Sequence, residues 1–344
     1  MTLVGHCPTP TIPLDPDRNQ AGLAIPSTRF PPVRAATIRD GDLRVEEHPD
    51  PQPGKGEILV RVRAAGLNGA DMLQRRGAYP APPGWPQDIP GLELAGEVAA
   101  RGPAAGRFAE GDRVMAVVGG GGQAELAVLH EREAMPVPST LDWPEAGALP
   151  EVFITAHDAL FTQCGLRSGE RLLVQGGAGG VGTAGIQLAR AAGASVTATV
   201  RREELRPAVE QLGARAIPPD GFEQHGPFDV VLELVGGPNL AGNLKALASG
   251  GRIVVIGIGA GAAAEVNLGA LMVKGAVLRG STLRGRPLEE KARASRAVER
   301  EVLPLIDDGA IRVPVEETFS LDEVAEAYER FAAGGKLGKL VLIT

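Results

Sequence analysis

The chain has 344 residues, of which 44% are hydrophobic and 22% charged, and this length and composition allow two globular domains with substantial cores. A formal net charge of -7, without any block rich in Lys and Arg, argues against nucleic acid as a partner. No run of 18 apolar residues predicts a membrane span, and the only cysteines, Cys7 and Cys164, are too far apart to suggest a metal site or a disulfide framework. These features fit a cytoplasmic protein best.

Residues 1–33 form a Pro-rich leader. Its prolines interrupt any hydrophobic periodicity, and no apolar stretch follows a basic start, so it is not a signal peptide. Three interpretations stay open: an extended or disordered segment, an arm that packs on the body or on a partner, and an overlong start of the chain.

A β-rich region follows the leader. Short runs rich in β-branched and apolar residues, separated by Gly and Pro turns, predict strands at 34–38, 42–45, 57–66, 93–99, 113–118 and 123–128. The segment 57–66 alternates with a period of two. Short strands joined by turns of this kind predict a compact, antiparallel, barrel-like domain.

The middle of the chain alternates strands and helices. Strands are expected at 171–175, 195–200, 215–217, 229–234, 252–257 and 276–281, with helical segments between them. This βα alternation predicts a doubly wound parallel sheet, so the fold class is α/β. A helical region is then expected at 288–308, and a last strand at 339–343 is expected to return to the first domain.

The most informative motif lies after the strand at 171–175. Gly177, Gly179 and Gly182 form G-x-G-x-x-G between a strand and a helix, the context that a dinucleotide fingerprint requires. The first glycine would permit the tight turn, the second would let the backbone approach a pyrophosphate, and the third would allow close packing of helix on strand. We therefore expect 177–182, including Gly180 and Val181, to bind cofactor; a flexible glycine loop is the alternative.

The next strand indicates which cofactor binds. An NAD site usually carries Asp or Glu about 20 residues beyond the fingerprint, where the carboxylate accepts a bond from the ribose. Here Arg201 and Arg202 stand at that position, and guanidinium groups suit a 2′-phosphate. The sequence therefore predicts NADPH as the cofactor, with two solvated surface arginines as the alternative. Glu203 and Glu204 are expected to open the following helix.

Six motifs stand out beside the order of the domains: Ala64–Asp71, Arg76–Pro80, Pro90–Val98, Gly120–Glu125, Ala148–Thr155 and Ser281–Arg284. With that order, they resemble the medium-chain dehydrogenase/reductase superfamily. Within it, the chain is similar to the zinc-free quinone oxidoreductase (zeta-crystallin-like) branch, and most like the tumour-suppressor-induced quinone oxidoreductase subgroup.

The resemblance implies a domain organisation. A GroES-like catalytic domain is expected at 34–154, an NADPH-binding Rossmann domain at 155–286, and a return to the catalytic domain at 287–344. It also implies that no metal is bound. Zinc-dependent relatives carry a cysteine where Asn68 stands and a histidine where Leu92 stands, and neither an amide nor an alkyl group replaces those ligands.

The resemblance further implies catalytic roles for three residues. A tyrosine at the position of Tyr79 lines the active site in the family, although Tyr79 could instead pack in a Pro-rich turn. Asn68 would hydrogen-bond the nicotinamide ribose or the substrate, or form a turn with Gly69. Arg284 would face the cleft from the end of the cofactor domain, or be solvated.

Four more residues join the expected cofactor contacts. Thr155 matches a threonine near the nicotinamide, with a helix cap as the alternative. Gly257 and Gly259 lie at the carboxyl edge of the expected sheet, where such folds bind their ligands, or form an ordinary glycine turn. Lys339, which opens the last strand, completes this set.

The chain is therefore expected to be an NADPH-dependent, zinc-independent reductase that transfers hydride to quinones or activated enones. A 2-alkenal or enoyl-thioester reductase, and a dinucleotide-binding protein without turnover, are the alternatives. No pair of carboxylates or Ser/His/Asp constellation stands out, so the proton is expected from Tyr79 or from solvent. Relatives are commonly oligomers, and a homodimer is expected.

Overall fold

The structure is a computed structural model and describes residues 32–344. Residues 1–31, and with them almost all of the expected leader, lie outside the described residues. Val33, the last residue assigned to the leader, belongs to strand β1 (Val33–Arg39), which pairs with β2 (Asp42–His48).

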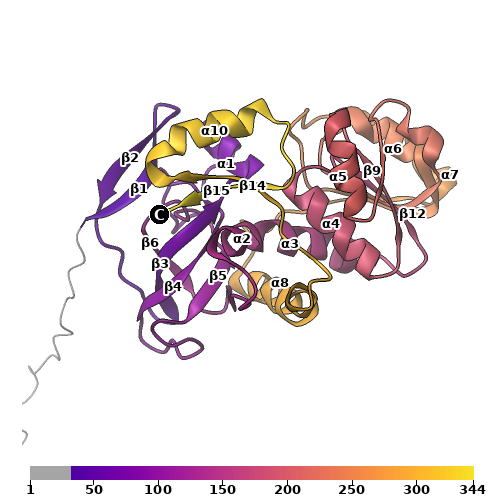
Figure 1. Ribbon diagram of the computed structural model, residues 1–344. Coiled ribbons are helices and arrows are strands. Elements are labelled where there is room, and N and C mark those ends of the chain that lie inside the picture. Colours follow the sequence, from indigo (N-terminus) through magenta and orange to yellow (C-terminus); the bar gives the residue numbers. More distant parts are fainter. Residues whose placement is uncertain (1–31) are drawn as a thin grey trace, which may run out of the picture. The chain divides into compact units, whose positions relative to one another are not determined.

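The β-rich part is built on a seven-stranded mixed sheet (Figure 1). Its strands run in the order β14-β15-β3-β4-β5-β7, and β6 also pairs with β3. All the pairings are antiparallel except that of β14 with β15. The bounds are β3 (Glu57–Gly66), β4 (Glu93–Arg101), β5 (Arg113–Val117), β6 (Leu126–His130), β7 (Ala134–Pro136), β14 (Val315–Ser320) and β15 (Lys339–Ile343).

Strand β15 comes from the end of the chain and pairs with β3 through Val341 and Gly66. Three helices accompany this sheet: α1 (Gly69–Arg75), α2 (Trp143–Ala148) and α10 (Val324–Ala333). A short helical turn precedes α10, and there Glu323 accepts a hydrogen bond from the backbone of Ser320 and so caps the start of the turn.

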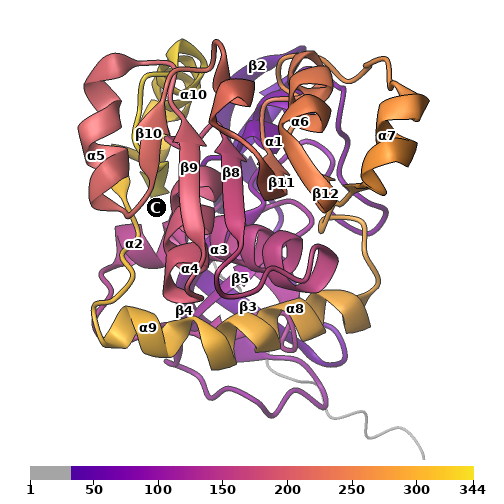
Figure 2. The ribbon, with the colours of Figure 1, turned by 90° about the vertical axis from the view of Figure 1, so that its right-hand side faces the viewer.

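The other part is a six-stranded parallel sheet (Figure 2). Its order, β10-β9-β8-β11-β12-β13, corresponds to 3-2-1-4-5-6 in chain order, the arrangement of a Rossmann fold. The strands are β8 (Arg171–Gln175), β9 (Ser195–Thr199), β10 (Arg215–Ile217), β11 (Phe228–Glu233), β12 (Leu247–Val255) and β13 (Val277–Gly280). The helices between them are α4 (Gly180–Ala191), α5 (Arg206–Gln211), α6 (Leu240–Ala246) and α7 (Leu268–Lys274).

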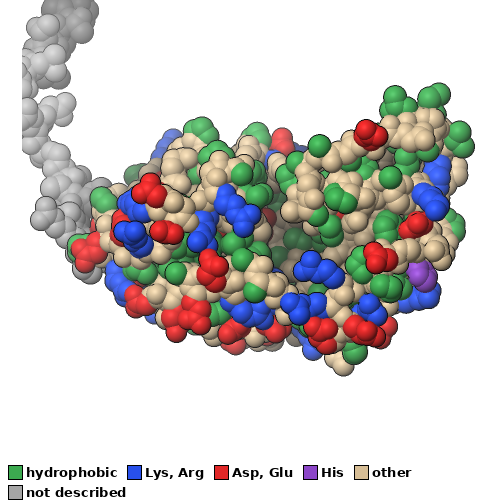
Figure 3. Space-filling model, turned by 90° about the horizontal axis from the view of Figure 1, so that it is seen from above, with side chains coloured by type: hydrophobic (Ala, Val, Ile, Leu, Met, Phe, Trp, Pro, Cys, Tyr) green, Lys and Arg blue, Asp and Glu red, His purple; other side chains and the backbone are tan. Residues whose placement is uncertain are grey.

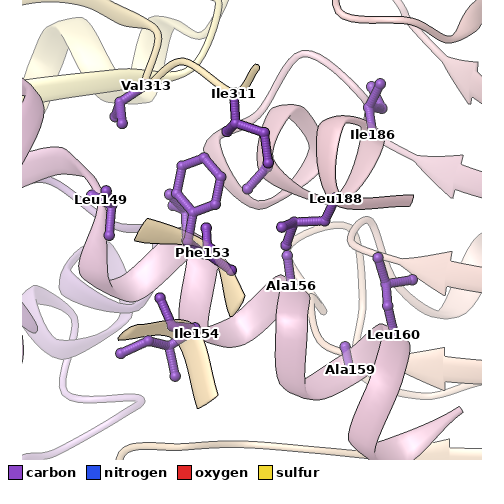
Figure 4. Packing of buried hydrophobic residues seen from close by; sticks show 14 of the residues in the cluster. Leu149, Phe153, Ile154, Ala156, Ala159, Leu160, Ile186, Leu188, Ile311 and Val313 are labelled. Carbon is purple, nitrogen blue, oxygen red and sulfur yellow. The ribbon is translucent and has the colours of Figure 1, made fainter. Parts of the chain in front are cut away.

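Helix α3 (Pro150–His157) joins the two sheets and packs against both α4 and β5. Residues 154 and 155, where the domain boundary was expected, lie inside α3, so the chain passes between the sheets through a helix rather than a loop. Figure 4 shows the ring of Phe153 directed toward Ile311 and Val313, while Ile186 and Leu188 of α4 complete the same core.

The C-terminal helical region also differs in detail from the expectation. Instead of one element at 288–308, it consists of α8 (Leu288–Glu301) and α9 (Leu303–Asp307). Pro304 lies in the first turn of α9, and because proline has no N–H, it cannot continue the hydrogen bonding of α8. Strands β7 and β14 were not expected, and β12 begins five residues earlier than the predicted strand at 252–257.

In the part of the chain that the structure describes, no helix combines the length and the apolar character needed to cross a membrane.

Candidate functional site

The glycine loop connects β8 to α4 at the carboxyl edge of the parallel sheet. Its left-handed residue is Gly176, with φ of 83°, so Gly176 makes the tight turn that the sequence assigned to Gly177. Gly177 is needed for another reason, because a Cβ there would lie 2.7 Å from Cβ of Ala198 in β9. This is a correction of the expected role of the first glycine, and the expected position of the motif is unchanged.

The other two glycines behave as a dinucleotide fingerprint requires. A Cβ on Gly182 would lie 2.5 Å from the carbonyl oxygen of Gly176, so the start of α4 can pack closely on the turn only with glycine. At Gly179 the nearest atom to such a Cβ is 3.5 Å away, an ordinary contact. The loop is therefore tightly packed at Gly177 and Gly182 and leaves room at Gly179, where a pyrophosphate would need to approach the backbone.

A buried network of polar side chains is hydrogen-bonded to the turn at Gly176. The Thr199 hydroxyl accepts a hydrogen bond from the backbone N–H of Gly176 (3.0 Å) and donates one to Oε1 of Gln175 (2.8 Å). Nε2 of Gln175 donates to Oδ1 of Asn243 (2.7 Å), and Nδ2 of Asn243 donates to Glu233 (2.6 Å). We call Gln175, Thr199, Glu233 and Asn243 the loop network. It ties the ends of β8, β9 and β11 to α6.

The two arginines expected to select NADPH come after β9 and the buried Val200, and both are exposed. Arg202 pairs with Glu204 at 3.4 Å. Glu203 and Glu204 begin a helical turn that leads into α5, as expected from the sequence. The loop before β15 runs past both arginines, because a Cβ on Gly335 would lie 2.5 Å from Nε of Arg202 and one on Gly334 would lie 3.6 Å from Arg201.

Gly257 and Gly259 follow β12 at the same edge of the sheet. A Cβ on Gly257 would lie 2.2 Å from the carbonyl oxygen of Leu234, so packing against the end of β11 already requires glycine here. No atom lies within 4 Å of such a Cβ at Gly259. Only Gly259 therefore leaves open space at the crevice.

A second group of polar side chains is buried between the two sheets, next to the glycine loop. The ammonium of Lys339 contacts Oε1 of Glu93, Oδ1 of Asn68 and the carbonyl oxygen of Leu67, each at 2.6 Å. Nδ2 of Asn68 donates to the same oxygen of Glu93 at 2.9 Å. Lys339 is 2% exposed and Glu93 is 0% exposed, so this is a buried ion pair.

Helix α3 adds two more members to this group. The backbone N–H of Glu151 donates to Oε2 of Glu93 at 2.8 Å, and the Thr155 hydroxyl donates to Oε1 of Glu151 at 3.4 Å. Oε2 of Glu151 is buried and has no hydrogen-bond partner within residues 32–344. We call Asn68, Glu93, Glu151, Thr155 and Lys339 the Lys339 cluster.

The Lys339 cluster touches the glycine loop. A Cβ on Gly180 would lie 2.7 Å from Val152, the residue after Glu151, and 2.8 Å from Cδ of Lys339. The two segments also pair directly, because the N–H of Gly338 donates to the carbonyl oxygen of Ala178. Figure 3 shows the surface hollowed between the part with the mixed sheet and the part with the parallel sheet.

These contacts change the expected roles of Lys339 and Asn68. The three N–H groups of Lys339 are used by protein oxygens, so a direct bond from its ammonium to the cofactor, as expected from the sequence, would require breaking one of them. The amide of Asn68 is likewise used at both its nitrogen and its oxygen. Both side chains are bound within the mixed-sheet part, to Gly66, Leu67 and Glu93 and to each other.

Arg284 is 4% exposed, so the alternative that it is solvated is wrong. Its guanidinium donates to the carbonyl oxygens of Gly119 (2.8 Å) and Tyr79 (2.9 Å) and to the side chain of Gln74 (2.5 Å). It also lies 5.0 Å from the centre of the Tyr79 ring. Arg284 thus anchors the segment that carries Tyr79, and all of these contacts are with protein groups.

Burial shifts three acids around this site. It raises the pKa of Glu151 to about 8, helped by the negative charge of Glu93, and raises the pKa of Asp71 to about 6. Asp71 accepts hydrogen bonds from the backbone of Asn68 and Gly91. Burial also raises the pKa of Tyr79; the charge of Arg284 lowers it, and that of Glu151 raises it further. Glu151 therefore lies close enough to Tyr79 to influence the ionisation of the tyrosine.

Sequence reasoning missed the pair of carboxyl groups formed by Glu93 and Glu151. A signal was present for Glu93, because a charged residue in a strand flanked by apolar residues needs a buried partner. No local pattern points from Glu93 to Lys339, 246 residues later in the chain. Within residues 32–344, no group of three or more His, Cys, Asp or Glu side chains is arranged to hold a metal ion.

Comparison with known proteins agrees with this architecture. Residues 54–139 match the family model described as "Alcohol dehydrogenase GroES-like domain", and residues 214–342 match the one described as "Zinc-binding dehydrogenase". The solved structure of an alcohol dehydrogenase superfamily protein from Novosphingobium aromaticivorans is similar, with a TM-score of 0.81 and 30% identity, covering 91% of this chain and 99% of that one.

Curated relatives carry a more specific name. A quinone oxidoreductase of Pseudomonas aeruginosa is 33% identical over 312 residues, which cover 88% of this chain and 95% of that protein. A quinone oxidoreductase of Rattus norvegicus is 31% identical over 309 residues, with 85% and 91% covered. The chain therefore belongs to the medium-chain dehydrogenase/reductase superfamily, in its quinone oxidoreductase branch.

Proposed function

We propose that the protein is an NADPH-dependent reductase that transfers hydride to quinones or activated enones without zinc. The observation that carries this proposal is the contact between the glycine loop and the Lys339 cluster. A cradle with room for a pyrophosphate at Gly179 lies against a buried group of acids and amides that can face an acceptor. The names of the relatives, quinone oxidoreductases, support the choice of acceptor.

The preference for NADPH rests on Arg201 and Arg202. They stand at the carboxyl end of β9, where a carboxylate would bind the ribose of NAD, and they are exposed and able to reach a phosphate. Glu204 neutralises part of the charge of Arg202 through its exposed ion pair. Arg201 is therefore expected to make the larger contribution to binding of the 2′-phosphate.

Independence from zinc rests on the chemistry of the side chains present. Asn68 and Leu92 stand where the zinc-bearing relatives have a cysteine and a histidine, and Leu92 is buried. The Lys339 ammonium already supplies a positive charge 2.6 Å from Oδ1 of Asn68. An amide, an alkyl group and an ammonium do not form a zinc site, so these residues do not fit the metal.

The chain's own residues bind and orient the reactants. A bound nicotinamide dinucleotide supplies hydride, while the protein supplies orientation and a dry environment. We assign Thr155, one turn beyond Glu151, to the nicotinamide end of the cofactor, and Tyr79 to the wall of the acceptor pocket. Arg284 keeps Tyr79 in place by binding its carbonyl oxygen and lying over its ring.

The activity is tested by following NADPH absorbance with an ortho-quinone, a para-quinone and a small enone in turn. Turnover of the quinones is expected, and turnover of the enone alone would instead favour a 2-alkenal or enoyl-thioester reductase. NADPH binding without turnover of any acceptor would contradict an enzymatic function. Activity is expected to persist in a chelator, and loss of stoichiometric zinc together with activity would contradict zinc independence.

Cofactor choice is tested by measuring the affinity of NADPH and NADH for the Arg201→Ala/Arg202→Ala variant. A charge-assisted hydrogen bond contributes about 1.5–3 kcal/mol, or roughly 10- to 100-fold in affinity, so loss of both arginines is expected to weaken NADPH binding by roughly 100-fold or more and NADH binding little. Arg215→Ala, an exposed arginine on neighbouring β10, is the control. Equal affinity of the unaltered protein for both cofactors would contradict the assignment.

We extend the proposal to a homodimer formed through the β13 edge of the parallel sheet. All four residues of β13 are exposed, and nearby α7 exposes Leu268, Met272 and Val273, the last at 87%. Hydrophobic side chains gather at this end of the molecule, at the right of Figure 3. An exposed edge strand beside an apolar patch favours pairing with another chain, and a second copy offers the same edge.

Light scattering after size-exclusion chromatography tests the dimer. Val273→Glu should shift the protein toward monomer, because it buries a charge at the interface, whereas Ala332→Glu on exposed α10 should not. A monomeric unaltered protein at micromolar concentration would contradict the dimer.

A further inference from the structure

The two carboxyl groups of the Lys339 cluster, Glu93 and Glu151, differ in how many of their oxygens have hydrogen-bond partners. Both oxygens of Glu93 are used, Oε1 by Lys339 and Asn68 and Oε2 by the backbone of Glu151. Glu151 has only the 3.4 Å bond from Thr155 to Oε1, and its buried Oε2 has no partner in the described part of the chain. A buried oxygen left without a partner is costly unless it carries a proton or meets a ligand.

The surroundings of Glu151 favour its protonated form. The charged and titratable groups that influence it are Glu93 on β4, Lys339 on β15 and Asp71 on α1. One ammonium faces three carboxyl groups, so they cannot all be ionised without unbalanced negative charge. Burial and Glu93 raise the pKa of Glu151 to about 8, and Lys339 lowers it less. Near neutral pH the carboxyl therefore carries a proton.

The position of Glu151 places this proton at the site of reduction. The next residue, Val152, touches the glycine loop at Gly180, and Thr155 lies one turn further along α3. On the other side, the charge of Glu151 acts on Tyr79 and on Arg284. The carboxyl thus lies between the dinucleotide loop and the residue that we assign to the acceptor pocket.

We propose that Glu151 donates the proton that completes reduction of the acceptor, a role that the sequence suggested for Tyr79 or solvent. This inference rests on the proposed function. Oε2 is the donor atom, because it is not committed to another bond. Tyr79 is then a positioning residue that shapes the pocket.

The step balances as follows in atoms and charge. The acceptor gains two electrons and one hydrogen as hydride and becomes an anion, centred on oxygen for a quinone and delocalised between oxygen and carbon for an enone. The O–H bond of Glu151 breaks, and a new O–H or C–H bond forms on the anion. The resulting carboxylate takes a proton from solvent, so each turnover consumes one proton in addition to the hydride.

The test compares Glu151→Gln with the unaltered protein on a para-quinone and on a small enone, from pH 6 to pH 10. Glutamine keeps the size and polarity of the side chain but cannot donate this proton as an acid. We expect kcat on the enone to fall roughly 10²-fold or more, the usual scale of general acid catalysis. A smaller loss is expected on the quinone, because a hydroquinone anion is less basic than an enolate.

The pH profile separates an acid from a structural residue. In the unaltered protein, kcat/KM on the enone should decline above about pH 8, where Glu151 loses its proton. This decline should be absent from Glu151→Gln, while its affinity for NADPH, measured by fluorescence, stays within about twofold. Glu151→Asp should recover part of the rate, and Glu326→Gln, an exposed change on α10, should match the unaltered protein.

Three results would overturn the donor role. Unchanged kcat and an unchanged pH profile in Glu151→Gln would do so while leaving the reductase function intact. A rate loss that comes with more than tenfold weaker NADPH binding, and with the alkaline decline still present, would show a structural role. If Tyr79→Phe rather than Glu151→Gln lost the 10²-fold, tyrosine would be the donor. An unaltered protein that binds NADPH but reduces neither acceptor would instead reject the proposed function, and the donor role with it.

Discussion

The loop network and the Lys339 cluster are both buried polar groups beside the glycine loop, but they are satisfied to different degrees. In the loop network, the side chains of Gln175, Thr199 and Asn243 are all hydrogen-bonded. Glu233 accepts hydrogen bonds from Asn243 and from two backbone N–H groups, at 2.6 and 2.8 Å. In the Lys339 cluster, one carboxylate oxygen of Glu151 has no partner among the described residues. A fully paired network makes a rigid cradle, whereas an incompletely paired one keeps a group available for chemistry.

The two groups also differ in charge. The loop network contains one carboxylate, held by neutral donors, and serves to fix a turn. The Lys339 cluster contains an ammonium and two carboxyl groups, with a third, Asp71, close enough to act on them. The contribution of the Lys339 cluster to the free energy of unfolding therefore depends on pH and on each charged partner. The following substitutions compare this contribution with that of neutral or exposed groups.

The largest effect is expected from Lys339→Met. Removing the ammonium leaves Glu93, which is fully buried, without its counter-charge, and breaking a buried ion pair in this way costs about 3–5 kcal/mol. Urea denaturation measures the loss in free energy of unfolding. Lys245→Met is the matched control, because the pair of Lys245 with Glu223 is exposed, and such pairs contribute about 0–1 kcal/mol.

Adding Glu93→Gln to Lys339→Met should restore much of the lost stability, because the uncompensated charge is then removed. Equal effects of Lys339→Met and Lys245→Met would show that the buried pair is no more important to the fold than an exposed one.

A pair of glycine substitutions separates packing from ligand binding in the loop. Gly182→Ala places a Cβ 2.5 Å from the carbonyl oxygen of Gly176, and such overpacking costs about 1–3 kcal/mol. Gly179→Ala meets its nearest atom at 3.5 Å, so it should fold normally and instead lose roughly tenfold or more in NADPH affinity. Thermal melting and fluorescence titration measure the two effects. A Gly179→Ala protein with full NADPH affinity would contradict the approach of the pyrophosphate at this residue.

Each of the two groups contains a buried threonine, and replacing each threonine by valine compares the two groups directly. Thr199→Val removes the acceptor for the N–H of Gly176 and the donor to Gln175, and it should cost about 1–3 kcal/mol in unfolding free energy. Thr155→Val removes one 3.4 Å bond to Glu151 and should cost less than about 0.5 kcal/mol. If Thr155 contacts the nicotinamide, Thr155→Val should still lower kcat/KM. Similar losses of stability in both variants would contradict the difference in pairing between the two groups.

The last comparison is a change in the pH dependence of stability. The folded state raises the pKa of Glu151 from 4.5 to about 8, so the stability it contributes is complete below pH 4.5 and is lost as pH rises through about 8. Glu151→Gln does not ionise. Its melting temperature, relative to the unaltered protein, should therefore increase from pH 5 to pH 8.5 by roughly 2 °C or more.

Shifted groups elsewhere act equally in both proteins of that comparison. Lys336, whose pKa burial lowers to about 7, therefore cancels in the difference. Glu326→Gln should show no pH-dependent difference at all. A constant difference between Glu151→Gln and the unaltered protein across this range would mean that Glu151 is ionised in the folded state.

The sequence by itself determined the features that are encoded in contiguous segments. The alternating pattern of β3, the short apolar runs of β8 and β10, and the glycine fingerprint each specify local backbone geometry, and β3, β8, β10 and β15 have the expected bounds. Strand β14, Val315–Ser320, was missed because its sequence carries few apolar residues and its hydrogen bonds come from β15. The turn was misplaced by one residue, since a run of consecutive glycines does not show which one has the positive φ.

Only the tertiary structure decided how the site is assembled. Asn68, Glu93, Glu151 and Lys339 come from the start of α1, from β4, from α3 and from β15, and no spacing in the sequence relates them. Whether Lys339 meets a cofactor or Glu93 depends on how the last strand joins the mixed sheet. The protonation of Glu151 depends in turn on burial and on charges brought from those distant segments. Burial and charge balance are properties of the packed chain, because both depend on neighbours that folding brings together.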